Sequence, residues 1–64
     1  METVRLEELT WTEVESAIED GVRTAIVPVG STEQHGPHLP LGTDSYIGEA
    51  VAERVAERLD DALV

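Results

Sequence analysis

Apolar residues recur at helical spacing in two stretches of the chain. Those of the first stretch are Val14, Ala17 and Ile18. Those of the second stretch, which recur every four positions, are Ile47, Val51, Val55 and Leu59. Amphipathic helices show this spacing because residues three and four apart share one face. The pattern predicts a short helix from Trp11 to Asp20 and a longer one from Ser45 to Asp61.

The ends of the first helix carry their own signals. Thr10 followed by Glu13 is typical of a capping box, in which each side chain bonds the backbone of the other residue. Leu9 and Val14 have the spacing of the hydrophobic staple that accompanies it. Gly21 suits the left-handed conformation that ends a helix. The apolar face is narrow, so we expect this helix to pack on a larger element.

The second helix has an acidic side. Its predicted solvent-facing stripe consists of Glu49, Glu53 and Glu57. Small residues lie beside its large apolar ones, at Ala50, Ala52 and Ala56. Arg54 precedes Glu57, and Arg58 precedes Asp61, by three positions. This spacing predicts weak ion pairs along the helix surface.

A strand and a long loop are predicted between the two helices. Residues Val22–Val27 are largely β-branched and apolar without alternation, which favours a strand buried on both faces of a parallel sheet, and Pro28 is expected to end its pairing. Residues Gly30–Thr43 hold three glycines and two prolines, which predicts a loop at the carboxyl end of that strand. Open α/β sheets build their sites there. The apolar residues Ala62–Val64 predict the start of another strand.

This order of helix, strand, loop, helix and strand start is typical of a βα unit in an α/β layered fold. Parallel strands need neighbouring strands and helices on both faces. Sixty-four residues bury little surface, and there is no cysteine to add a disulfide. We therefore expect residues 1–64 to be part of a larger domain and not to fold stably by themselves.

The charge balance excludes some partners. Fourteen Asp and Glu stand against four arginines and no lysine, so nucleic acid is not an expected partner. The excess suggests the hypothesis of a salt-rich, halophilic cytoplasm, because salt screens self-repulsion; circular dichroism showing full structure at low KCl would refute it. The first residues form neither a basic nor an apolar segment, which predicts no leader peptide, and no apolar run reaches membrane length. We expect no membrane contact and a cytoplasmic location.

The candidate chemistry lies in the loop. Both histidines of the chain are there, at positions 35 and 38, together with Glu33 and Asp44. Glu33 and His35 are two apart and leave an extended segment on the same side, while Asp44 arrives from the helix end of the loop. Two carboxylates and one imidazole suit Zn²⁺, Mn²⁺ or another first-row ion. Without cysteine, any metal must be held by such groups.

Each of these residues also has a structural interpretation. Glu33 can be a solvated carboxylate, His35 and His38 can be ordinary loop residues, and Asp44 or Ser45 can cap the following helix. A phosphate-binding loop is the weaker alternative, because the Walker spacing and its lysine are absent.

A longer string of residues resembles a known family. Pro28–Ser31, then Glu33–Pro40 (Glu-Gln-His-Gly-Pro-His-Leu-Pro) and then Asp44 are similar to the signature of the creatininase family of metal-dependent amidohydrolases. Leu9–Trp11 resembles the family's opening, so the likeness covers essentially the whole chain. The resemblance implies that residues 1–64 are the N-terminal part, about a quarter, of one three-layer α/β/α sandwich domain with a mostly parallel sheet.

The resemblance also implies a site with two divalent ions, Zn²⁺ or Mn²⁺. Glu33 would bind one ion, His35 the other, and Asp44 would bridge them, while a histidine and a glutamate would come from a later segment. Ser31 and Gln34 are candidates to orient these ligands, although plain loop hydrogen bonding is the alternative for both. His38 has a clear position in the motif but receives no ligand role from it.

The implied reaction is hydrolysis of a non-peptide or cyclic amide C–N bond in a small-molecule substrate by a metal-activated water. Substrates implied by the family are creatinine, formamidopyrimidine ribotides and a redox-peptide precursor, and the residues that would choose among them lie outside this chain. Family members form homo-oligomers, hexamers among them. Residues 1–64 alone are expected to be inactive. The competing hypothesis is a catalytically inert segment that acts only as a structural or interaction element through its apolar faces.

Overall fold

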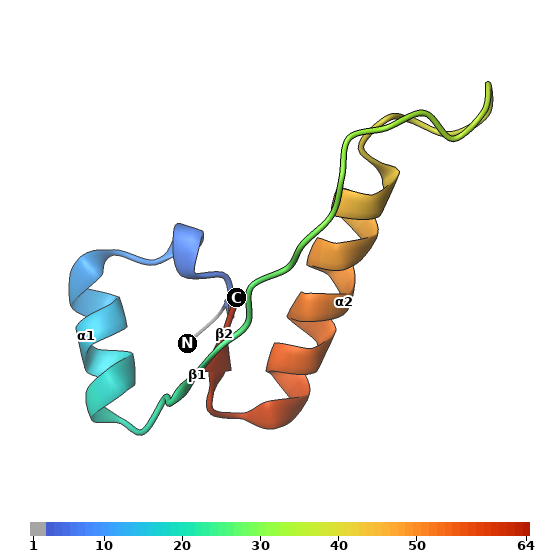
Figure 1. Cartoon of the computed structure of the whole chain (residues 1–64). Helices are drawn as coiled ribbons and strands as arrows, with labels where there is room; N and C mark the ends of the chain where they lie inside the picture. The colour runs from blue at the N-terminus through green and yellow to red at the C-terminus, as the bar shows by residue number, and fades with distance from the viewer. Residues whose placement is uncertain (1–2) are drawn as a thin grey trace.

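The structure, a computed structural model, describes residues 3–64. Its elements in chain order are the 3-10 helix η1 (Leu6–Glu8), helix α1 (Trp11–Glu19), strand β1 (Thr24–Ala25), helix α2 (Thr43–Leu59) and strand β2 (Ala62–Leu63). In Figure 1 the strand pair lies between α1 and α2. The predicted order of helix, strand, loop, helix and strand is confirmed, and η1 is an addition that the apolar pattern did not predict.

The two strands are parallel, with Thr24 opposite Ala62 and Ala25 opposite Leu63. The Ile26 N–H donates to the Leu63 carbonyl at 2.8 Å and continues this pairing. Because parallel neighbours require a crossover, α2 is the connection between them. The structure is thus compatible with a fragment of an α/β fold. The three-layer sandwich stays a prediction.

The prediction for the first strand was wrong in length and in burial. Residues 22–27 were expected to pair and to be buried on both faces, but β1 covers two residues, and both are exposed. Val27 beyond it is 78% exposed. Burial on two faces needs a strand on each edge and a layer on each side, and in residues 3–64 β1 has one partner strand.

The N-terminal segment lies along the other edge of β2. The Val64 N–H donates to the Val4 carbonyl, and the Leu6 N–H donates to the Val64 carbonyl, both at 2.8 Å. Bonds from one residue to the two neighbours of another are those of a parallel pair, which sets Arg5 opposite Val64. The extended segment formed by β2 and Val64 after it is therefore hydrogen-bonded on both sides.

Arg5 also ties this segment to α2. Its Nε and Nη2 donate to Glu53 Oε2 at 3.0 and 2.8 Å. The hydrogen bond and the charge of Glu53 raise the pKa of Arg5 above its ordinary value. The prediction that Glu53 faces solvent holds only in part: its side chain is 36% exposed, but its carboxylate accepts hydrogen bonds from a residue 48 positions away. The predicted pairs Arg54–Glu57 and Arg58–Asp61 are also absent from the ion pairs within 4 Å that residues 3–64 form.

The signals at the ends of α1 are confirmed. Thr10 is the N-cap: its hydroxyl accepts from the Glu13 N–H, and Glu13 Oε1 accepts from the Thr10 N–H at 2.8 Å. These bonds satisfy N–H groups that have no partner within the helix. Gly21 follows the helix with a φ of 113°, as predicted for the residue that ends it.

Helix α2 begins two residues before the predicted start and ends at Leu59. Asp60 ends it in the left-handed conformation, with a φ of 68°. The residues it buries are Ala52 and Ala56, whereas the large apolar residues Ile47, Val51, Val55 and Leu59 are all exposed. Alanines allow the helix to approach β2 closely, which leaves the large side chains on its other faces.

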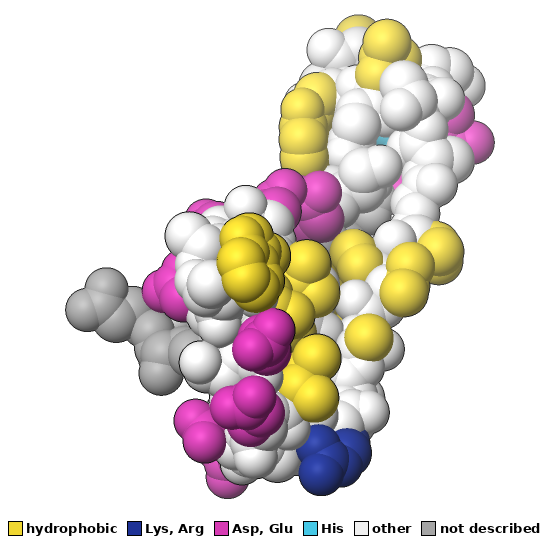
Figure 2. Space-filling model, turned by 90° about the vertical axis from the view of Figure 1, so that its left-hand side faces the viewer, with side chains coloured by type: hydrophobic (Ala, Val, Ile, Leu, Met, Phe, Trp, Pro, Cys, Tyr) yellow, Lys and Arg dark blue, Asp and Glu magenta, His cyan; other side chains and the backbone are white. Residues whose placement is uncertain are grey.

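The buried core is small. The buried apolar residues of the described part are Ala17, Ala52, Ala56, Ala62 and Leu63. Figure 2 shows apolar side chains gathered on the surface among acidic ones. The radius of gyration is 14.1 Å, against roughly 11 Å for a compact domain of this length. Within residues 3–64, no helix has the length and apolar character needed to cross a membrane.

Candidate metal centre

The loop after β1 meets the first turn of α2 at Gly30. A Cβ on Gly30 would lie 2.7 Å from the backbone N and Cα of Ser45 and 2.9 Å from the carbonyl carbon of Asp44. Only a residue without a side chain fits this contact between two backbones. The contact sets residues 31–33 beside the start of α2, although eleven residues of chain separate Ser31 from Thr43.

The tip of the loop is closed by hydrogen bonds to two backbone carbonyls. The Glu33 N–H donates to the Leu41 carbonyl at 3.0 Å, and the Thr43 hydroxyl donates to the Pro40 carbonyl at 2.6 Å. Gly36 turns the tip with a φ of 77°. In Figure 1 this tip extends beyond the N-terminal end of α2. The hydrogen bond between Glu33 and Leu41 fixes the position of Glu33 relative to α2.

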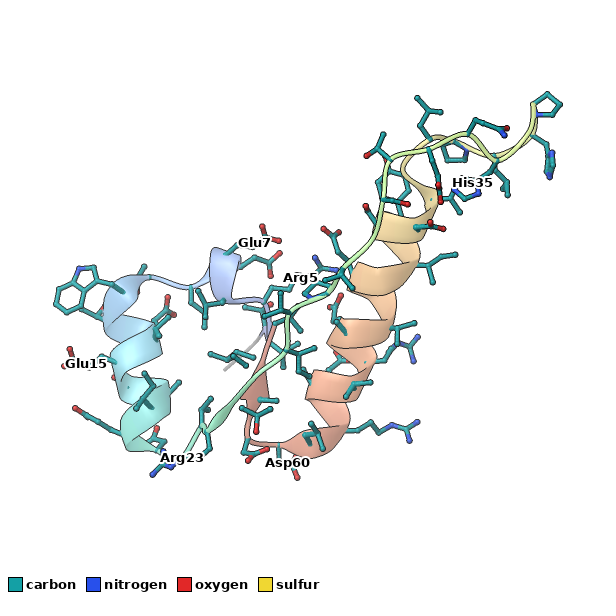
Figure 3. All side chains as sticks on the ribbon, in the orientation of Figure 1. Arg5, Glu7, Glu15, Arg23, His35 and Asp60 are labelled. Atoms are coloured by element: carbon teal, nitrogen blue, oxygen red, sulfur yellow. The ribbon has the colours of Figure 1, made fainter. Side chains whose placement is uncertain are left out.

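The three predicted ligands come together at this point. Glu33, His35 and Asp44 each offer one ligand atom, and these atoms all lie within 4.8 Å of one another. His35 Nε2 is 3.6 Å from Asp44 Oδ1. Figure 3 shows His35 on the loop near the first turn of α2. Residues separated by up to eleven positions thus converge as the sequence predicted.

The alternative roles of Asp44 and Ser45 as helix caps are wrong. The N-cap of α2 is Gly42, and no side chain bonds the first turn in that role. Asp44 lies in the first turn, where the partial positive charge of the helix N-terminus favours a carboxylate. Its oxygens are therefore free to face the loop.

The donors fit a divalent cation. His35 Nε2 is buried and has no hydrogen-bond partner among the described residues, because 3.6 Å is too long for a hydrogen bond to Asp44. Two ligands of one tetrahedral ion, each about 2.1 Å from it, lie roughly 3.4 Å apart. Glu33 is exposed, and His35 and Asp44 are half-buried, so solvent can reach the cluster. A cation would give the buried nitrogen its partner and offset the repulsion of the carboxylates.

The other loop candidates divide into two groups. The Ser31 hydroxyl lies 2.9 Å from Glu33 Oε1 and 3.0 Å from Asp44 Oδ2, so it contacts two of the three ligands. Gln34 Oε1 instead accepts from the Gly36 N–H at 2.8 Å, which is the loop bond proposed as its alternative role. His38 is exposed and lies outside the cluster. Sequence reasoning missed Gly30, because only the fold shows which backbone it touches.

Comparison with known proteins gives relatives for nearly the whole chain. A family model described as creatinine amidohydrolase, the creatininase family, matches residues 7–64. The mycofactocin precursor peptide peptidase of Mycolicibacterium smegmatis is 65% identical over 37 residues, which are 58% of this chain and 15% of that protein. The creatinine amidohydrolase of Pseudomonas putida is 44% identical over 52 residues, which are 81% of this chain and 20% of that enzyme.

A third relative carries a different hydrolase name. The 3-dehydro-scyllo-inosose hydrolase of Thermotoga maritima is 55% identical over 31 residues, which are 48% of this chain and 10% of that protein. The chain therefore spans between 10% and 20% of the length of these three relatives. No solved structure matches the chain significantly. Since the family model covers residues 7–64 and the ligand cluster lies within them, the chain belongs to the creatininase family.

Proposed function

We propose that this chain carries one half of the metal centre of a hydrolase that cleaves an amide C–N bond. The observation that carries the proposal is the convergence of Glu33, His35 and Asp44, with a buried His35 Nε2 that lacks a hydrogen-bond partner among the described residues. The family supports it, and the three relatives described above all have hydrolase names. We further propose that residues 1–64 are the N-terminal part of one such domain.

In this proposal the cofactors are two divalent ions, Zn²⁺ or Mn²⁺. Glu33 would hold one, His35 would hold the other, and Asp44 would contact both. Such ions, when bound, polarise an amide carbonyl and lower the pKa of a water molecule. The contribution of this chain is to hold three ligands in place and to keep their cluster open to solvent on the side of Glu33. A histidine and a glutamate from another segment complete the site, so residues 1–64 alone are inactive.

The substrate proposed first is a small molecule with a non-peptide or cyclic amide, as the name of the Pseudomonas relative describes for that enzyme. Peptide hydrolysis is the second candidate. It is favoured by the peptidases of Mycolicibacterium smegmatis and Mycobacterium tuberculosis, which are 65% identical over 37 and 34 residues respectively. Both are C–N cleavages, and both need the same polarised carbonyl.

A graft tests whether this chain supplies half of a working centre. The segment of the Pseudomonas creatinine amidohydrolase that matches this chain is replaced by this chain, and metal content and creatinine hydrolysis are measured. We expect both to be retained. The variants Glu33→Ala, His35→Ala and Asp44→Ala of the graft should lose both. Removing a group that only orients ligands costs roughly 10- to 100-fold in affinity or activity, so removing a ligand should cost at least that.

Glu57→Ala is the matched control, because it also removes one exposed carboxylate but lies on α2 outside the cluster. It should keep metal and turnover. The proposal is wrong if the three ligand variants keep full metal content. A graft that folds, binds no metal and is inactive would favour the competing hypothesis of a structural element. The same graft into the Mycolicibacterium peptidase, assayed on its peptide, tests whether substrate choice lies outside this chain.

A further inference from the structure

One hydroxyl joins the two carboxylates of the cluster. Ser31 Oγ is 2.9 Å from Glu33 Oε1 and 3.0 Å from Asp44 Oδ2. A serine hydroxyl has one hydrogen, so it can donate to only one of these oxygens at a time. Two carboxylates that converge on a single donor repel each other, and this repulsion is relieved when a cation lies near both. The contact is thus suited to a pair of carboxylates that share a metal.

The same hydroxyl sets the orientation of Asp44. One oxygen of this carboxylate, Oδ2, faces Ser31, and the other, Oδ1, faces His35 Nε2 at 3.6 Å. Holding Oδ2 therefore fixes the rotation of the carboxylate about its Cβ–Cγ bond. Within the described residues, no other side-chain hydrogen bond holds the Asp44 carboxylate. Without Ser31, the carboxylate could therefore rotate, and Oδ1 would not be kept turned toward the histidine. When the hydroxyl hydrogen turns to Glu33 instead, it holds Oε1 in the same way and leaves the second oxygen of that side chain free.

The backbone fixes the position of Ser31 itself. Gly30, the preceding residue, is in contact with the backbone of Asp44 and Ser45, at the distances given above. Ser31 therefore stands next to Asp44 because two stretches of backbone touch, and not because a flexible side chain reaches across. The neighbouring hydroxyl of Thr32 forms no side-chain hydrogen bond within residues 3–64. Of these two neighbouring hydroxyls, only that of Ser31 contacts the cluster.

We propose that Ser31 is the positioning residue of the metal centre: its hydroxyl aligns the carboxylates of Glu33 and Asp44 so that one oxygen of Asp44 faces His35. Ser31 is not a ligand. The proposal rests on the proposed function, because it concerns the same cations. It predicts that Ser31 acts on metal affinity before any substrate is present.

The test measures Mn²⁺ affinity by electron paramagnetic resonance in the Pseudomonas graft, where the rest of the sheet is present. Ser31→Ala should weaken Mn²⁺ binding roughly 10-fold or more, the scale of losses when groups that orient ligands are removed. Ser31→Thr keeps a hydroxyl at the same position and should stay within about threefold of the unsubstituted protein. Thr32→Ala removes a neighbouring hydroxyl without a bond to the cluster and should leave affinity unchanged. Circular dichroism of each variant checks that helix content is the same.

The outcomes separate this inference from the proposed function. If Glu33→Ala abolishes Mn²⁺ binding but Ser31→Ala binds as tightly as the unsubstituted protein, the role of Ser31 is wrong and the metal centre stands. If Thr32→Ala loses as much affinity as Ser31→Ala, the effect is a general loosening of the loop, and the role of Ser31 is also wrong. If the graft folds but binds neither Mn²⁺ nor Zn²⁺, both proposals fail together.

Discussion

At the scale of single residues, the site depends on a glycine, which has no side chain that could bind a metal. A Cβ at Gly30 would meet three backbone atoms of Asp44 and Ser45 at 2.9 Å or less. Flexible side chains can move away from such a contact, but the first turn of a helix cannot do so without disturbing its hydrogen bonds. The contact is therefore what places the loop, and with it Ser31 and Glu33, against Asp44.

Gly30→Ala should for this reason weaken the metal centre. In the Pseudomonas graft we expect at least the roughly 10-fold loss of Mn²⁺ affinity predicted for Ser31→Ala, together with a stability loss of about 1–3 kcal/mol from overpacking. Gly21→Ala is the matched control: Gly21 has a φ of 113° and open space around it, so alanine there strains the backbone far from the loop. It should lower the melting temperature and leave Mn²⁺ affinity unchanged. Equal metal affinity in Gly30→Ala would contradict this account.

At the scale of elements, α1 begins with a bond network that depends on ionisation. The hydrogen bond from the Thr10 backbone and that from its hydroxyl lower the pKa of Glu13 below its ordinary value of 4.5. Ionised Glu13 therefore stabilises the folded helix above that pH, and this contribution is lost as the pH falls through the lowered pKa. The loss lies on the acid side of 4.5, and α1 is the element that should show it.

Thr10→Ala tests this dependence. It removes the hydroxyl that accepts from the Glu13 N–H and donates to its carboxylate, so we expect the pKa of Glu13 to return part of the way to 4.5. The measurement is the carbon-13 NMR titration of the Glu13 side chain, with helix content followed by circular dichroism in the same samples. Ser16→Ala is the control, because it also removes a hydroxyl from α1 but leaves the capping box in place. An unchanged Glu13 titration in Thr10→Ala would show that the hydroxyl has no part in holding the carboxylate.

The elements also show what local sequence can and cannot predict. The capping box, the stop at Gly21 and the parallel pairing of the two strands follow from residues close together in the chain or from the order of elements. The length and exposure of β1 do not, because they depend on which strands and helices lie beside it. Glu53 illustrates the same point: helical spacing puts it on the acidic stripe, but its partner Arg5 is 48 residues away. Glu33, His35 and Asp44 could be proposed from the motif, whereas the contacts of Gly30 and Ser31 with α2 required the fold.

At the scale of the whole molecule, the elements are connected by many hydrogen bonds but by little apolar packing. Strand β2 pairs with β1, Val64 after it is bonded to Val4 and Leu6, and Arg5 links the N-terminal segment to α2. The buried residues among positions 3–64, however, are four alanines and one leucine. An apolar hollow of about 550 Å³ lies between α1 and the strands, lined in part by Val14, Ile18 and Leu63. Burial of apolar area is the main favourable term in folding, so these elements have little to set against the loss of chain entropy.

We therefore expect residues 1–64 alone to show no cooperative thermal transition. Exposed Ile18, Val27, Val51 and Leu59 contribute little while they face water, and no large side chain of the described residues is fully buried. The net charge of −10 adds self-repulsion in an elongated molecule of 46 × 21 × 17 Å. Differential scanning calorimetry should give a broad or absent peak for the chain, and a sharp one for the graft, in which the Pseudomonas sheet and helices can cover these faces. A sharp, reversible transition of the chain by itself would mean that its hydrogen bonds and small core suffice, and would refute this expectation.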